Sequence, residues 1–91
     1  MILVRPHIRN ATNFDSARIQ QLLRDNDLWI EGWDWGELQG WIVAEYKDRV
    51  VGAVQVLPGK PVGVMLYLVV DTEYHRTGIG AQLARAAEVY F

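Results

Sequence analysis

The sequence predicts a small domain of the α/β (α+β) class, and three features support this prediction. The 91 residues are 51% apolar and 22% charged, which suits a globular fold with one modest core. Apolar residues recur at helical spacing in two segments, one in each half of the chain. Between them lie three mostly apolar runs separated by polar turns, as expected for strands. We therefore expect one domain over residues 1–91, with the order β-α-(α)-β-β-β-α.

Composition argues against several classes of function. The formal net charge is −2 and Lys and Arg are not clustered, so general affinity for nucleic acid is not expected. The sequence has no cysteine, which excludes disulfides and thiolate metal sites, and we expect no bound metal. The apolar start is broken at Arg5, which predicts neither a signal peptide nor a membrane-spanning segment. The expectation is a soluble, cytoplasmic protein without a membrane partner.

The residue pattern in the first part of the chain predicts a strand followed by a helix. Residues 3–9 are expected to form a short strand, and Thr12 with Asp15 has the spacing of a capping pair at a helix start. The helix should extend to about residue 26, with a buried stripe of Ile19, Leu22 and Leu23. Its polar residues are expected to face water: Arg18, Gln20, Gln21 and Arg24. Residues 27–39 fit either a short second helix or a structured loop.

Three strands are then predicted, over residues 41–47, 50–57 and 62–70. The first two are joined by a polar turn, and the segment 58–61, with two prolines and a glycine, is a second turn signal. The third run is apolar apart from Gly63 and Tyr67, so we expect it to be covered on both faces and central in the sheet. A polar connection over 71–77 leads to a helix over 78–91.

The connection before this last helix holds the most informative motif. It reads His75-Arg76-Thr77-Gly78-Ile79-Gly80, at the point where an apolar strand has ended and a helix begins. Amides at a helix start lack intrahelical partners, and glycines let a phosphate approach them closely. Gly-x-Gly alone is weak, since roughly one such triplet is expected by chance. A dinucleotide fingerprint is absent because Leu83 fills its third glycine position, and no Gly-Lys-Ser/Thr follows as in a P-loop.

The motif and the order of elements together resemble the GCN5-related N-acetyltransferase (GNAT) family. Its signature is Gln/Arg-x-x-Gly-x-Gly/Ala at the start of the third helix, after a central fourth strand, and here His75 stands in the Gln/Arg position. The resemblance spans the whole chain and implies a GNAT-like mixed sheet. The family continues with a fifth strand, a fourth helix and usually a final hairpin. The fold is therefore expected to be truncated after its third helix.

The resemblance implies acetyl-CoA as acyl donor and a small-molecule or peptide amine as acceptor. Backbone groups of Leu68 and Val70 would meet the pantetheine arm, and residues 75–81 would hold the pyrophosphate. An N–H near Val70 would polarise the thioester carbonyl. The implied cofactor-binding residues are Leu68, Val69, Val70, His75, Arg76, Thr77, Gly78, Ile79, Gly80 and Ala81. The alternative is a non-catalytic CoA-binding or interaction module that keeps only the cofactor half of the fold.

The resemblance assigns no catalytic acid or base. His75 is expected to bind phosphate rather than to act as a base, and apolar Val64 occupies the position where some relatives carry a Glu. Glu45 and Glu73 are weaker candidates for the base. The Tyr that protonates the leaving thiolate in the family would lie beyond residue 91.

The tryptophans leave two alternatives open. Trp29, Trp33 and Trp35 either line the acceptor site or add buried area, and Trp41 is expected in the core. The strand over 62–70 carries no Lys or Pro to protect an open edge, so a homodimer or a strand-swapped assembly is also expected.

Overall fold

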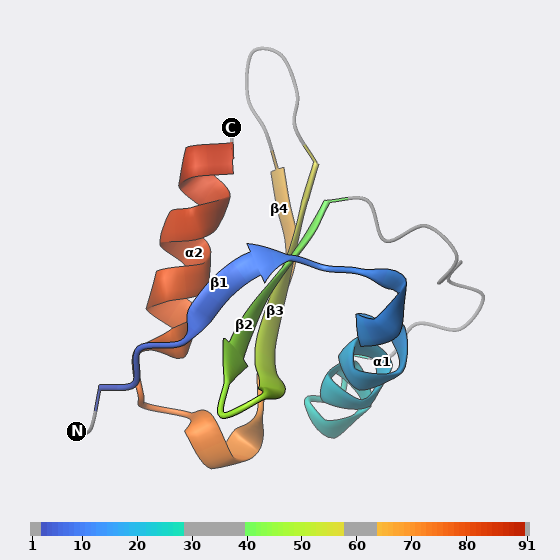
Figure 1. Cartoon of the computed structure of the whole chain (residues 1–91). Helices are drawn as coiled ribbons and strands as arrows, with labels where there is room; N and C mark the ends of the chain where they lie inside the picture. Colours follow the sequence, from blue (N-terminus) through green and yellow to red (C-terminus); the bar gives the residue numbers. More distant parts are fainter. Residues whose placement is uncertain (1–2, 29–39, 58–63, 91) are drawn as a thin grey trace.

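The computed structural model describes residues 3–28, 40–57 and 64–90 (Figure 1). An antiparallel sheet has the order β1-β2-β3-β4, with β1 (His7–Asn10), β2 (Trp41–Tyr46), β3 (Arg49–Leu57) and β4 (Val64–Val70). Helix α1 (Ser16–Asp25) covers one face and α2 (Ile79–Tyr90) covers the other. Two single-turn helices, η1 (Asn13–Asp15) and η2 (Thr72–Tyr74), precede them. The α/β class and the order of these elements are confirmed, while the predicted second helix or loop lies outside the described residues from position 29 onward.

The structure corrects two details of the strand predictions. The first strand begins at His7 rather than at residue 3, because the Val4 N–H donates to the Thr77 carbonyl at 2.9 Å and Pro6 has no N–H to give. Leu68 and Val70 pack on the α2 side and Val69 packs on the α1 side, but β4 stands last in the order of the described sheet and not at its centre. The end of β4 is therefore apolar because α1 and α2 cover its two faces, and not because a strand lies on each side of it.

Local signals explain how α1 starts and stops. The Asp15 carboxylate accepts a hydrogen bond from the Thr12 N–H at 2.7 Å, which confirms the predicted pairing of these residues ahead of the helix. After the helix, Asp27 adopts a φ of 58°, and the Leu28 N–H turns back to the Leu23 carbonyl at 2.8 Å. A left-handed residue at this position ends helices because it redirects the chain while its neighbours satisfy the last carbonyls.

The hairpin between β2 and β3 closes with the tightest kind of turn. Tyr46 pairs with Arg49, and the two residues between them, Lys47 and Asp48, have φ of 53° and 61°. Two successive positive φ values are the mark of a type I′ turn, whose twist matches that of the flanking strands. The predicted polar turn is thus confirmed.

The core forms two layers because apolar side chains alternate across the sheet. On the α1 side, Ile19, Leu22 and Leu23 pack with Trp41, Val43, Val50, Ala53 and Val69, which confirms the core position of Trp41. On the α2 side, Ile79, Leu83 and Ala87 pack with Val4, Ile42, Ala44, Val51, Val54 and Val56. Neither described helix has the length and apolar character needed to cross a membrane.

Gly52 in β3 sets how closely α2 approaches the sheet. A Cβ built there would lie 2.9 Å from Leu83 Cδ1, 3.1 Å from Ile79 Cγ2 and 3.3 Å from the Val69 carbonyl oxygen. These distances are too short for an unshifted side chain, and Leu83 and Ile79 are themselves fully buried. Glycine is therefore required here by packing.

Replacing Gly52 by Ala should lower the free energy of unfolding by roughly 1–3 kcal/mol, the usual cost of overpacking a core. Denaturant titration followed by circular dichroism measures the loss. Gly80→Ala is the matched control, because a Cβ there meets only Val70 Cγ2 at 3.7 Å and Ala favours a helix. Equal stability of Gly52→Ala and the parent would show that α2 can move away from β3 without cost.

Candidate cofactor site at the end of β4

The backbone of β4 presents Leu68 and Val70 at the outer edge of the sheet. The Asp71 N–H donates to the Val51 carbonyl at 2.8 Å, so residue 71 bonds toward β3. Backbone groups point to alternate sides along an antiparallel strand. Leu68 and Val70 therefore direct their N–H and C=O groups away from β3, toward an edge on which no strand of the described ranges lies.

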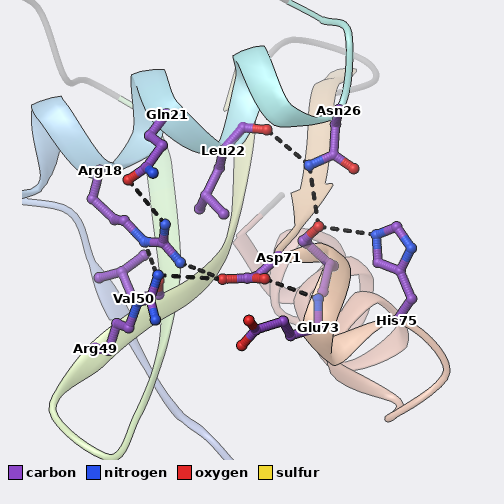
Figure 2. Close-up of polar contacts among 10 residues, drawn as sticks. Arg18, Gln21, Leu22, Asn26, Arg49, Val50, Asp71, Glu73 and His75 are labelled. Carbon is purple, nitrogen blue, oxygen red and sulfur yellow. Dashed lines mark hydrogen bonds and ion pairs between the residues drawn. The ribbon is translucent and has the colours of Figure 1, made fainter.

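The carbonyl of Val70 is already occupied by two side chains, those of Asn26 and His75, which Figure 2 labels. Asn26 Nδ2 donates to it at 3.1 Å, and His75 Nε2 lies 3.0 Å away. A carbonyl oxygen only accepts, so Nε2 carries the proton in this contact. The N–H of Val70 is the outward backbone group that has no hydrogen-bond partner among the described residues.

Asp71, the residue after β4, is the centre of a polar cluster that sequence reasoning missed. Its carboxylate lies 2.5 Å from Arg18 Nη2 and accepts the Glu73 N–H at 2.9 Å, while Arg18 Nε donates to the Val50 carbonyl at 2.8 Å. Arg18 was predicted to face water, but only 15% of its side chain is exposed. The prediction failed because Arg18 flanks the buried stripe of α1 and its long side chain reaches over that edge to the sheet.

Burial and hydrogen bonding act on Asp71 in opposite directions. Burial raises the pKa of the Asp71 carboxyl, but the Glu73 N–H, the Arg18 guanidinium and the charge of Arg49 together outweigh it. The pKa of Asp71 therefore lies below its ordinary value, and the group is ionised at neutral pH.

The loop from Asp71 to α2 is closed by its own short-range bonds. The Tyr74 N–H donates to the Asp71 carbonyl at 2.8 Å, and the Thr77 hydroxyl donates to the Tyr74 carbonyl. Arg76 and Gly78 adopt positive φ of 65° and 84°. Gly78 is left-handed and so cannot be helical, which is why α2 begins one residue later than predicted.

The start of α2 offers amides beside the end of β4. The first bond of the helix runs from the Gln82 N–H to the Gly78 carbonyl at 3.1 Å, so the amides of Ile79, Gly80 and Ala81 have no acceptor within the helix. Side-chain room exists there as well, since the nearest atom to a Cβ at Gly80 would be Val70 Cγ2, at 3.7 Å. The end of β4 and the start of α2 therefore form one continuous surface.

The predicted cofactor-binding residues fall into three groups. Leu68, Val70, Thr77, Gly78 and Gly80 are half-buried, while His75, Arg76 and Ala81 are exposed. Val69 and Ile79 have side chains in the core, so only their backbone groups can meet a ligand. Trp29, Trp33 and Trp35 lie outside the described residues.

The acids that were weaker candidates for a base differ in their surroundings. Glu45 lies 3.7 Å from Arg9, whereas Glu73 is exposed. Within the described ranges, no group of three or more His, Cys, Asp or Glu side chains could hold a metal ion.

A comparison with family models decides the assignment. Residues 7–91 match the model of the acetyltransferase (GNAT) family. The chain belongs to the GNAT family. A comparison with curated protein sequences gave no significant match.

Several solved structures share the fold of this GNAT chain. A Mycobacterium tuberculosis protein, Rv2747, solved in complex with CoA, is 23% identical with a TM-score of 0.78 over 93% of this chain. The N-acetylglutamate synthase of Neisseria gonorrhoeae, complexed with coenzyme A and N-acetyl-glutamate, is 16% identical with a TM-score of 0.82 over 96%. The diaminobutyrate acetyltransferase of Paenibacillus lautus, complexed with its substrate and coenzyme A, is 15% identical with a TM-score of 0.76 over 91%.

The GNAT chain is shorter than these proteins. It spans 57%, 22% and 56% of the three chains just named. At these identities the likeness concerns the fold, which agrees with the observed order of strands and helices.

The cluster around Asp71 predicts how stability depends on pH. Because the pKa of Asp71 is lowered by folding, its stabilisation is present in full above the unfolded value of about 3.9 and is lost as pH falls through the lower folded pKa. Asp71→Asn keeps the shape and the acceptor for the Glu73 N–H but removes the charge. We expect a loss on the order of 3 kcal/mol at pH 7, as for other broken buried pairs, shrinking below about pH 4.

Urea titrations of both proteins between pH 2 and 7 measure this difference. Arg49→Gln is the control, since Arg49 is 3.8 Å from the carboxylate and 55% exposed. It should cost about 1 kcal/mol or less. A difference between parent and Asp71→Asn that stays constant over the whole range would contradict the role given to the Asp71 charge.

Proposed function

We propose that this GNAT chain carries the cofactor-binding part of an acetyltransferase that moves an acetyl group from acetyl-CoA to an amine. One observation carries the proposal. The start of α2, whose first amides have no acceptor within the helix, comes close to the Val70 side chain at Gly80, a glycine whose side-chain position is open, and Val70 turns its N–H outward from the sheet. Backbone donors of this kind suit a long ligand that carries a pyrophosphate. The CoA complexes of the structural neighbours support the same view.

Each part of acetyl-CoA has a proposed partner. The pyrophosphate would meet the amides of residues 78–81, with Arg76 adding a positive charge, and the pantetheine arm would run along the outer edge of β4 beside Leu68 and Val70. The Val70 carbonyl is engaged by Asn26 and His75, so the contribution of Val70 is a donor, its N–H. A donor there would stabilise the oxyanion that forms when the thioester is attacked.

The proposed chemistry is direct transfer. The amine nitrogen attacks the thioester carbonyl carbon, the C–S bond breaks, the amine loses a proton and the CoA sulfur leaves as thiolate or thiol. A primary amine of a small molecule or peptide is the proposed acceptor. The neighbours that act on amino acids and diaminobutyrate support this class.

Gly80→Asp should abolish measurable CoA binding, because it places a side chain and a negative charge where the pyrophosphate would lie. Isothermal titration calorimetry with CoA measures the effect. Gly80→Ala, which has room for its Cβ, should bind within about threefold of the parent. Unchanged affinity in Gly80→Asp would remove the proposed pyrophosphate site.

His75→Gln and Arg76→Ala should behave differently. Gln can still donate to the Val70 carbonyl, so His75→Gln should leave CoA affinity nearly unchanged. Arg76→Ala should weaken binding several-fold at low salt and less at high salt, since an exposed charge is screened. Calorimetry at two ionic strengths measures both. A large loss in His75→Gln with intact folding would instead assign the imidazole a direct role.

The activity itself is tested by release of free CoA thiol from acetyl-CoA over a panel of amines. Amine-dependent release that is lost in Gly80→Asp supports the proposal. CoA binding without release for any amine would support a non-catalytic CoA-binding module instead.

A further inference from the structure

A cavity lies between α2 and the N-terminal segment of the chain. It has a volume of about 400 Å³ and is lined by residues 3–5 on one side and by Gly78, Ala81, Gln82 and Arg85 on the other. In Figure 1 the N-terminal segment runs past the start of α2 before it enters β1. A volume of this size lies within the usual range of small-molecule sites.

The wall of this cavity is held by specific bonds. The Val4 N–H donates to the Thr77 carbonyl at 2.9 Å, and Gln82 Nε2 donates to the Val4 carbonyl at 2.6 Å. Leu3 lies close enough to Gly78 that a Cβ there would be 3.1 Å from Leu3 Cδ2. Both backbone groups of Val4 are thus satisfied by the loop and helix, and residues 3–5 are fastened alongside α2.

The lining combines apolar surface with two arginines. Leu3 is an apolar side chain with 71% of its surface exposed, and Val4 is buried beneath it. The ion pairs of the described ranges use Arg9, Arg18 and Arg49, and within those ranges neither Arg5 nor Arg85 has a carboxylate partner. In a chain of net charge −2, two guanidinium groups that lack a carboxylate partner among the described residues and line one cavity favour an anion.

The cavity is distinct from the proposed cofactor surface. Ala81, Gln82 and Arg85 lie at helical spacing on one face of α2, whereas Gly80 faces Val70 of β4. Gly80 and Gln82 are two residues apart, which is about 200° around a helix of 3.6 residues per turn. The two surfaces share Gly78 and Ala81, but Gly80 and Gln82 point to opposite flanks of the helix.

We propose that this cavity binds a small organic oxyanion, a carboxylate or a phosphate carrying an apolar body. The anionic group would lie between Arg5 and Arg85, and the apolar body would cover Leu3 and Val4. The ligand would bind independently of CoA, although Gly78 and Ala81 belong to the walls of both sites.

The test uses fluorinated probes observed by ¹⁹F NMR with the full chain. The probes are 4-fluorobenzoate and 4-fluorophenyl phosphate, with neutral 4-fluorobenzamide as the isosteric control. At least one anionic probe should bind saturably, with a dissociation constant in roughly the millimolar range for so small a ligand, and the benzamide should not. The stronger of the two anions distinguishes a carboxylate site from a phosphate site.

Variants locate the binding. Arg85→Gln should weaken it about tenfold, as expected for loss of one charged hydrogen bond. Arg24→Gln makes the same change of charge on α1, across the sheet, and should leave it unchanged. Binding should persist when CoA is present in excess.

Any of four results overturns the proposal: no saturable binding of either anion, equal binding of the benzamide, equal effects of the Arg85 and Arg24 substitutions, or displacement of the probe by CoA. Failure of CoA to bind would count against the proposed function alone, because the probe titration does not depend on it.

Discussion

The ionised carboxylate of Asp71 is the group on which the arrangement of the candidate site depends. It stands where β4 ends, and through it α1, β3 and the loop before α2 are joined to that strand. Taking such a charge out of water is costly, and only several simultaneous partners offset the cost. Arg18 supplies two of the connections, because its guanidinium reaches both Asp71 and the Val50 carbonyl (Figure 2).

Val70, the residue before Asp71, is the one through which this cluster affects the proposed function. Asn26, at the end of α1, and His75, in the loop, both engage the Val70 carbonyl from the open side of β4. Through Asn26, α1 on one face of the sheet holds the carbonyl of Val70. On the other face, α2 comes close to the Val70 side chain at Gly80. Backbone donors contribute most when they are held before the ligand arrives, since no reorganisation is then needed. The polar cluster that stabilises the end of β4 thus also positions the backbone for which an acyl-transfer role is proposed.

The order of elements could be predicted because it depends on local patterns. Three features can be recognised from a few neighbouring residues: the buried stripe of α1, the turn at Lys47 and Asp48, and the apolar run of β4. The Gly-x-Gly turn after a strand was equally visible. The pairing of Arg18 with Asp71 was not, because 53 residues separate them and a single sequence carries no sign of which distant charges meet. The bonds that move Val4 out of β1 and onto α2 are hidden for the same reason.

We propose that CoA binds where β4 ends and α2 begins. Amide chemical-shift mapping by ¹⁵N NMR during a CoA titration tests it most directly. Saturable shifts are expected for Val70, Gly80 and Ala81, with little change at Lys47 and Asp48 in the β2–β3 turn. Saturable shifts confined to other parts of the chain, or no shifts up to about 1 mM CoA, the top of the usual range of KM values, would contradict it.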